Sequence, residues 1–290
     1  MHIYLIAGPL LGLATGLPVA WKWQLGMARA AVCLLAGSML VAMVLAAADP
    51  WLRLAAAAGT VALWGGTTLA ALAALLALFF RDPDRPVPGR QDVIVSPADG
   101  RVVYVRPFAP ARLPVAEKHG RPHELRELAG TDLGRGGAVA VGISMNLADV
   151  HVNRAPIAGR VRWVMRAPGT FGSLRDPANL LSNERVTTLI EKGDLQVALV
   201  QIASRLVRRI VTFAVPGHEL PLGGRVGAIR LGSQVDLILP ARGDIRLAIQ
   251  VGDRVIAGQT IVALVISEPG GPRVPAAPGT MSGAAGRGAR

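Results

Sequence analysis

Long apolar runs fill the first 80 residues of the chain, whereas the remainder has the mixed pattern of an ordinary globular sequence. Residues 30–48 and 55–80 carry no charged side chain, and they approach or exceed the roughly 20 residues that a helix needs to cross a bilayer. We therefore predict a transmembrane helix in each. Residues 3–20 are also apolar but contain Pro9 and Pro18, so three arrangements stay open for them: spanning, re-entrant or interfacial.

Short runs rich in β-branched residues begin after Arg81 and are divided by Gly, Pro and Asp. This pattern is typical of many short strands rather than of helices. The runs lie at 92–95, 101–105, 137–144, 159–164, 185–190, 195–202, 208–213, 225–230, 234–239, 246–251 and 260–266. We expect a mainly β fold, in which a β-sandwich or barrel-sandwich-like domain follows the N-terminal transmembrane helices.

Two segments after the membrane region do not fit the strand pattern. Residues 106–136 are rich in Pro, Gly and charged residues and are predicted to form a long surface insertion. Residues 268–290 have too little apolar content to fold, so we predict a disordered tail. The chain thus divides into a membrane anchor of two to three hydrophobic helices at 1–80, a globular domain at 81–267, and the tail.

The formal net charge of +12 suits either nucleic acid or an anionic lipid surface, where each nearby Lys or Arg contributes roughly 1 kcal/mol. The adjoining apolar helices favour lipid. A nucleic-acid binder would place aromatic platforms among its basic residues, but only 4% of the residues are aromatic, and we expect no nucleic-acid partner. The single cysteine, Cys33, excludes an intrachain disulfide and a cysteine-based zinc cluster.

Basic residues also predict which way the anchor faces. Lys22 and Arg29 precede the run at 30–48, and Arg81 and Arg85 follow the last apolar run. Because basic flanking loops favour the cytoplasmic face, we predict a protein of the inner cell membrane with its globular domain on the cytoplasmic side. Several apolar runs do not fit the plan of a cleaved signal peptide, so we expect the N-terminus to be retained.

The first polar motif is SPADG at 96–100. Asp99 stands at a favoured turn position, and Gly100 can supply a positive φ. Taken alone, the motif is accounted for by a turn between two strands. Its interest comes from the two motifs that follow it.

The second motif surrounds His151, with Asp149, Asn153 and Arg154 within three residues of it. Such a concentration of polar and ionisable groups is unusual in a β region. A lone histidine is more often a packed or solvated residue than a catalytic one, so both interpretations stay open at this point.

The third motif is Gly232-Ser233, between two strand-like runs. A Gly-Ser pair commonly forms a turn or bulge. It also permits a chemical step, because the serine hydroxyl of a strained Gly-Ser bond can attack the preceding carbonyl and form an ester by an N-to-O acyl shift. Elimination from that ester would leave a pyruvoyl group.

The chain resembles the phosphatidylserine decarboxylases, and within them the short bacterial form with N-terminal spans. The resemblance covers about residues 80–266 and rests on an ordered set of motifs. They are RDP at 81–83, SPADG at 96–100, DVHVNRAP at 149–156, NER at 183–185, RRIV at 208–211 and LGS at 231–233.

The resemblance implies a proenzyme that cuts itself between Gly232 and Ser233 into a long β chain and a short α chain. Ser233 would become a covalent pyruvoyl group, with no metal needed. Asp99 and His151 would form with Ser233 a charge-relay arrangement that activates the hydroxyl.

The activity implied is that of a carboxy-lyase of phospholipid biosynthesis, which converts phosphatidylserine to phosphatidylethanolamine and CO₂. The pyruvoyl ketone would take the substrate amine and withdraw electrons as carbon dioxide leaves. The partners implied are the anionic phospholipid substrate, the membrane and the two chains of one precursor, with a homo-oligomer left open.

Two positions depart from the family pattern. Long forms carry a second histidine three residues after the first, where this chain has Arg154. His151 would then serve both self-cleavage and protonation of the product, or Arg154, Asp149 or water would take one role. Gln234 stands where many members carry Ser, Thr or Arg.

Other motif residues allow either a substrate-binding or a structural role. Arg154, Asn183 and Glu184 could hold the lipid headgroup or form polar turns. Arg208 and Arg209 could donate to the lipid phosphate or coat an exposed strand.

Two non-enzymatic interpretations compete with the decarboxylase. The segments at 95–103 and 251–265 resemble the paired halves of biotinyl and lipoyl carrier domains and of membrane adaptor proteins. A carrier needs a modifiable lysine at a tight turn between the halves, which we do not find in the sequence, whereas a non-catalytic, membrane-anchored adaptor stays open. A pseudoenzyme that keeps the fold without cleaving is the other alternative, because of Gln234 and the single motif histidine.

Overall fold

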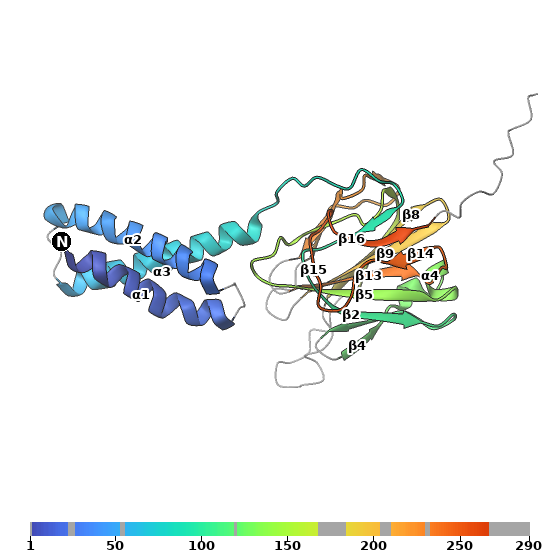
Figure 1. The fold of residues 1–290 in the computed structure, drawn as a ribbon, viewed down its shortest axis with the longest axis horizontal. Helices are drawn as coiled ribbons and strands as arrows, with labels where there is room; N and C mark the ends of the chain where they lie inside the picture. Colours follow the sequence, from blue (N-terminus) through green and yellow to red (C-terminus); the bar gives the residue numbers. More distant parts are fainter. Residues whose placement is uncertain are drawn as a thin grey trace, which may run out of the picture.

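The computed structural model consists of three long helices joined to a β domain (Figure 1). It describes residues 2–22, 27–52, 56–118, 121–167, 184–203, 210–229 and 233–266. Several predictions concern residues outside these ranges: Asn183, Arg208, Arg209, Gly232 and the tail at 268–290.

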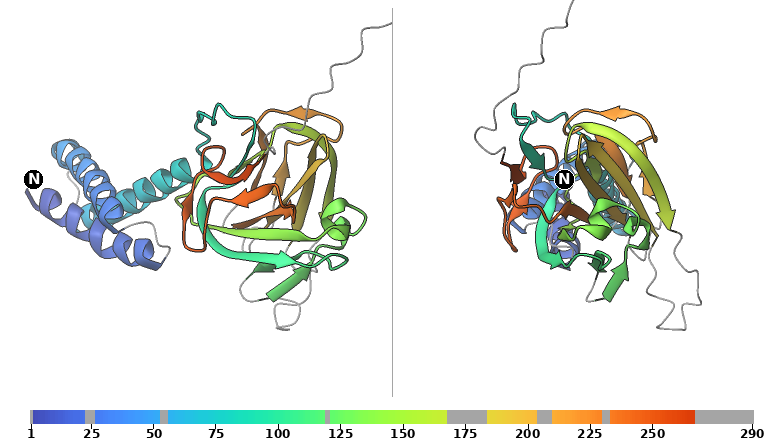
Figure 2. Two further views of the ribbon diagram at one scale, coloured as in Figure 1. Left: turned by 45° about the vertical axis from the view of Figure 1, so that its right-hand side comes forward. Right: turned by 90° about the vertical axis from the view of Figure 1, so that its right-hand side faces the viewer.

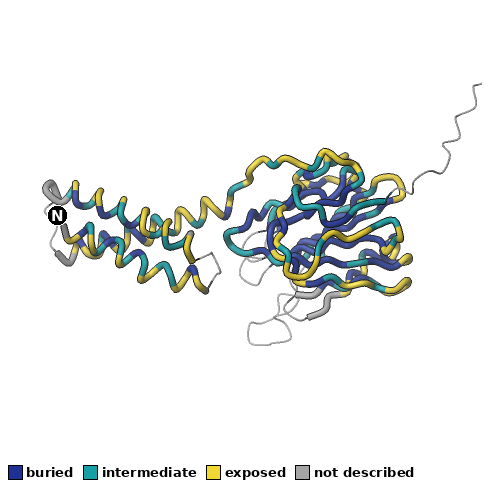
Figure 3. The backbone as a smooth tube through the Cα atoms, viewed as in Figure 1, coloured by how far each residue is buried: buried dark blue, intermediate teal, exposed yellow. Residues whose placement is uncertain are grey.

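Three apolar helices form the N-terminal bundle: α1 (His2–Lys22), α2 (Met27–Leu52) and α3 (Ala56–Phe80). Each contains a stretch long and apolar enough to cross a membrane. The helices predicted at 30–48 and 55–80 are confirmed, and residues 3–20 also form a helix, with both prolines inside it. Exposed positions run along the bundle (Figure 3), and many of them carry large apolar side chains, as contact with lipid requires.

Small residues let α1 and α2 approach closely. A Cβ added at Gly12 would lie 2.7 Å from the Cβ of Ser38 on α2. Helix pairs in membranes commonly pack in this way, because lipid offers no hydrophobic drive for helices to associate.

Eight antiparallel strands form the main sheet, in the order β11-β7-β8-β9-β13-β5-β2-β15, and the sheet curls strongly (Figure 2). Their bounds are β2 Gly100–Phe108, β5 Ala138–Met145, β7 Gly159–Ala167, β8 Arg185–Lys192, β9 Leu195–Ile202, β11 Glu219–Leu220, β13 Ser233–Pro240 and β15 Arg254–Val255.

Two three-stranded sheets pack beside the main sheet, in the orders β1-β16-β14 and β10-β12-β6. Their bounds are β1 Val93–Val95, β6 Val152–Arg154, β10 Ile210–Thr212, β12 Arg225–Ile229, β14 Ile245–Leu247 and β16 Ile261–Val265. The segments compared above with the halves of a carrier domain do pair, since β1 lies against β16 and β2 against β15. The predicted fold class, a mainly β domain after apolar helices, is confirmed.

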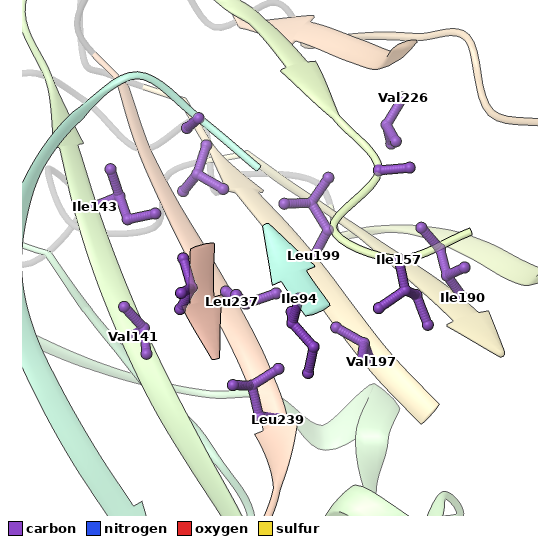
Figure 4. Close-up of a cluster of buried hydrophobic side chains, with 14 of the residues drawn as sticks. Ile94, Val141, Ile143, Ile157, Ile190, Val197, Leu199, Val226, Leu237 and Leu239 are labelled. Atoms are coloured by element: carbon purple, nitrogen blue, oxygen red, sulfur yellow. The ribbon is translucent and has the colours of Figure 1, made fainter. Parts of the chain in front are cut away.

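Side chains of β13 alternate between two apolar clusters, one on each face of the main sheet. Val235, Leu237 and Leu239 belong to the larger cluster, between the main sheet and the two small sheets (Figure 4), whereas Ile238 belongs to the smaller one. This alternation is the two-residue period of a strand buried on both faces.

The smaller cluster is completed by residues from the segment 106–136. That segment, predicted as a surface insertion, carries the hairpin β3 (Val115–Lys118) and β4 (Arg121–Glu124), the 3-10 turn η1 (Arg126–Leu128) and the short helix α4 (Asp132–Arg135). Three of its leucines, Leu125, Leu128 and Leu133, are fully buried against the sheet. This segment has an apolar side that covers one face of the main sheet. Its many charged residues make that side hard to recognise in the sequence.

Most predicted strands are found within two or three residues of their expected ends. The prediction at 246–251 is wrong in extent, because β14 ends at Leu247 and the chain then turns at 251–252. The apolar run there instead packs Ile249 against the larger cluster without forming a strand.

Candidate active site

The polar motifs converge at one end of the main sheet. The start of β13 pairs with the end of β5 through Ser233 and Met145. The start of β2, directly after Asp99, pairs with the same end of β5. The start of β8, directly after Glu184, pairs with the end of β9, which also borders β13. Antiparallel register therefore brings segments distant in sequence to one edge.

The SPADG turn is fastened to the His151 segment by the backbone. The amide of Arg154 donates to the carbonyl of Pro97 over 2.8 Å. Gly100 has a φ of +148°, and a Cβ there would lie 2.2 Å from the carbonyl oxygen of Ser144. Only glycine fits this close approach of two strands.

Asp99 is a buried carboxylate with four donors. The guanidinium of Arg85 holds both oxygens, one of them over 2.7 Å, and the amides of Ala257 and Val150 donate over 2.8 and 3.2 Å. Burial alone would raise the pKa of the Asp99 carboxyl, but these partners outweigh it and lower the pKa below its usual value. Asp99 is therefore a fixed negative charge at the site.

His151 is buried and held through one ring nitrogen. Its Nδ1 lies 2.8 Å from the carbonyl oxygen of Asp149, so Nδ1 carries the proton and Nε2 is the acceptor. Among the described residues, Nε2 is buried and has no hydrogen-bond partner. The orienting acceptor is thus a backbone carbonyl, while the nearby Asp99 acts on the ring through its charge.

The end of the last membrane helix covers this histidine. The ring of Phe79 lies 4.1 Å from the imidazole, centroid to centroid, at 35°. Burial is the main cause that lowers the pKa of His151 to about 4, assisted by the charge of Arg81 and opposed by the Asp149 carbonyl and by Asp99. At neutral pH the ring is therefore uncharged and able to accept a proton.

Residues 79–85, here called the exit segment, lead from α3 into the site. Asp82 accepts from Arg154 over 2.9 Å and also pairs with Arg225, which in turn donates to Asp84 over 2.9 Å. The side chain of Arg154 is only 6% exposed. Sequence reasoning gave the exit segment no functional role beyond its RDP motif, although four charged residues directly after an apolar run are a usable signal.

The segment before Ser233 is bordered by residues fixed beside His151. The amide of Ile229, at the end of β12, donates to the carbonyl of His151 over 3.1 Å. Four residues later, Ser233 begins β13. Gly232 lies outside the described residues, and the predicted cleavage point is its bond to Ser233.

Gln234 is anchored in the protein interior. Its amide donates to Asp236 over 2.8 Å, and the hydroxyl of Tyr104 donates to the same carboxylate. Asp236 is fully buried. The side chain of Gln234 is therefore held on the face of the sheet that carries the smaller cluster. This contact fixes the backbone next to Ser233.

The remaining predicted site residues have other partners or cannot be placed. Glu184, directly before β8, forms an ion pair with Arg166 near the end of β7. Asn183, Arg208 and Arg209 lie outside the described residues. Within the described part of the chain, no three His, Cys, Asp or Glu side chains are grouped so that they could hold a metal ion.

A family model described as phosphatidylserine decarboxylase matches residues 72–263. Three similar proteins are each named phosphatidylserine decarboxylase proenzyme. The protein of Symbiobacterium thermophilum is 39% identical over 68% of this chain and 82% of its own, that of Chlorobium chlorochromatii 39% over 63% and 76%, and that of Geobacter sulfurreducens 33% over 70% and 83%.

Proposed function

The chain belongs to the phosphatidylserine decarboxylase family, and on that premise we propose that it is a proenzyme that cleaves itself at Gly232-Ser233 and then decarboxylates phosphatidylserine at a membrane surface. The observation that carries this proposal is His151, a buried imidazole whose Nε2 has no hydrogen-bond partner among the described residues, at the sheet end where β13 begins with Ser233.

His151 acts as the base of self-cleavage. Its Nε2 takes the proton of the Ser233 hydroxyl, whose oxygen attacks the Gly232 carbonyl, and passes that proton to the amide nitrogen as the C–N bond breaks and the ester forms. Elimination then removes the α proton of Ser233 and breaks its Cβ–O bond, which separates the chains and leaves Gly232 as a carboxylate and a dehydroalanine at the new N-terminus. One water molecule hydrolyses the imine form of that group, which releases ammonia and leaves the pyruvoyl group.

Asp99 and Arg154 support this base in different ways. Asp99 stabilises the imidazolium that forms when His151 takes a proton, and its own position is fixed by Arg85. Arg154, expected as a headgroup ligand or a replacement for the second histidine, has a structural role in this proposal. An arginine does not release its proton in proteins, and its guanidinium already binds the exit segment.

The pyruvoyl group derived from Ser233 supplies the electron-withdrawing carbonyl that decarboxylation needs. The chain's own residues orient it: Gln234 anchors the backbone that follows, and His151 moves protons at Nε2. Phe79 keeps water from one face of the imidazole. Since Phe79 lies in the last turn of α3, the headgroup of a membrane lipid would meet the site at the bilayer surface, on the cytoplasmic side.

Intact mass spectrometry of the purified protein tests the self-cleavage. The parent should yield pieces of 232 and 290 − 232 = 58 residues, the shorter with a blocked N-terminus, and should release CO₂ from phosphatidylserine in vesicles. Ser233→Ala should stay uncut, whereas Ser144→Ala, a serine on the neighbouring strand, should cleave like the parent. A folded parent that stays uncut would favour the pseudoenzyme or adaptor.

A further inference from the structure

A half-enclosed hollow lies inside the membrane bundle. Its volume is about 410 Å³, which falls within the roughly 300–1,000 Å³ of small-molecule sites. All three helices line it, with Gly12 and Gly16 from α1, Gly37 from α2, and Trp64, Leu75 and Leu78 from α3. We call this hollow the bundle groove.

The bundle groove offers almost no polar contact. Its described hydroxyl groups are used within their own helices. Thr15 donates to the Leu11 carbonyl over 2.7 Å and Ser38 to the Leu34 carbonyl over 2.6 Å, and Thr67 and Thr68 both donate to the Trp64 carbonyl over 2.9 Å. A ligand here gains by apolar contact alone, and a hydrocarbon chain meets that condition.

The groove lies in the half of the bundle nearest the candidate active site. It is lined by the last turns of α1, the first turns of α2 and the last turns of α3, and these ends face the β domain (Figure 1). From Trp64 to Leu78 the lining of α3 rises about 20 Å. Leu78 directly precedes Phe79, the residue against His151.

We infer that the bundle groove binds one acyl chain of the phospholipid substrate and thereby holds its headgroup at the His151 end of α3. This inference rests on the proposed function. A membrane helix is about 10–12 Å across with its side chains and needs an open face, whereas a methylene chain can enter a narrow, half-enclosed hollow sideways from the bilayer.

Gly37 gives a way to fill the groove without disturbing the helices. It lines the groove, and a Cβ added there would meet no atom within 4 Å. Gly65 on α3 is the matched control, because a Cβ there also meets nothing within 4 Å but Gly65 does not line the groove. The test compares Gly37→Ala, Gly37→Leu and Gly37→Phe with Gly65→Leu and Gly65→Phe in the full-length protein.

Each variant is reconstituted in vesicles and assayed with a long-chain phosphatidylserine, and separately with a dihexanoyl phosphatidylserine, whose short chains cannot occupy the groove. Gly37→Leu and Gly37→Phe should lower kcat/KM for the long-chain lipid on the order of tenfold, in order of side-chain size, and leave dihexanoyl turnover and self-cleavage unchanged. Both Gly65 variants should match the parent.

Three outcomes would overturn the inference: equal losses with both lipids, no loss with either lipid, or equal losses in the Gly65 variants, which would indicate a helix or second copy on the bundle surface. A parent that turns over neither lipid would instead contradict the proposed function. Crosslinking of a phosphatidylserine with a photoactivatable acyl chain to uncut Ser233→Ala protein tests the groove independently of turnover, since it should be lost in Gly37→Phe and kept in Gly65→Phe.

Discussion

At the scale of single residues, the proposed mechanism requires a neutral His151. Burial against Phe79 favours the neutral ring and lowers its pKa to about 4. In the unfolded chain the same histidine titrates near its ordinary pKa of about 6.5. Between these two values the unfolded state binds more protons, so stability is lost as the pH falls from about 6.5 toward 4.

The rate of self-cleavage should follow the folded-state pKa of His151. Because the base must be neutral, the rate should stay level from pH 8 to pH 5 and fall only as the pH approaches about 4. Arg81→Gln removes a charge that lowers the pKa, so its fall should begin at a higher pH. Single-turnover cleavage of freshly refolded precursor measures both profiles, and a parent midpoint near 6.5 would contradict the buried, uncharged ring.

Arg85 is predicted to be essential for the charge of Asp99 at the site. Their side chains are 9% and 11% exposed, and removing one partner of a buried pair costs about 3–5 kcal/mol. Arg85→Gln should lower the stability by that order and slow self-cleavage, while Arg85→Lys should recover part of both because it restores the charge without the two-pronged contact.

The exposed pair of Arg90 and Asp92 provides the control for Arg85. Its members are 58% and 42% exposed, so solvent already screens their charges. Arg90→Gln should leave the melting temperature and the cleavage rate unchanged. Equal effects of the two substitutions would mean that Arg85 acts only through net charge, and not through Asp99.

At the scale of elements, the segment 106–136 covers the face of the main sheet opposite to the two small sheets. Leu128 is fully buried in the smaller cluster, so Leu128→Ala should cost about 2–5 kcal/mol. Leu247→Ala, at a leucine that is 38% exposed, should cost much less. Denaturant unfolding measures the free energy of unfolding of both variants. A loss for Leu128→Ala as small as that for Leu247→Ala would show that the segment does not contribute to the core.

Local pattern was enough to predict the elements but not their long-range contacts. Charge-free runs predicted the membrane helices, and β-branched runs predicted most strands. The partners of the exit segment could not be predicted, because Asp82 pairs with Arg154 and Arg225, 72 and 143 residues away. Nor could residue types predict that a backbone carbonyl, at Asp149, would orient His151.

At the scale of the whole molecule, the anchor and the catalytic domain form one site. The exit segment brings Phe79 to His151, Arg85 to Asp99 and Asp82 to Arg154, so the end of α3 cannot move away from the domain without exposing these groups. Under the proposed function, the orientation of the three helices in the membrane therefore also decides from which leaflet the substrate is taken.

The number of helices that cross the bilayer fixes the topology of the chain. If all three helices cross the bilayer, the N-terminus and the β domain lie on opposite sides, and the basic residues near Lys22 and Arg81 place the domain in the cytoplasm. A Gly89→Cys substitution at this exposed position, in a Cys33→Ala background, should react with an impermeant maleimide only after the inner membrane is permeabilised. An N-terminal tag should be reached by antibody once the outer membrane alone is permeabilised.

The tag distinguishes an α1 that crosses the bilayer from one that does not, and the cysteine shows on which side the β domain lies. A tag and a cysteine that both need an opened cytoplasm would mean that α1 does not cross, because two spans return the chain to its starting side. A cysteine that reacts in intact cells would place the domain outside and contradict the charge bias. Only with three spans do the ends of α1 and α3 that line the bundle groove lie in the cytoplasmic leaflet beside His151.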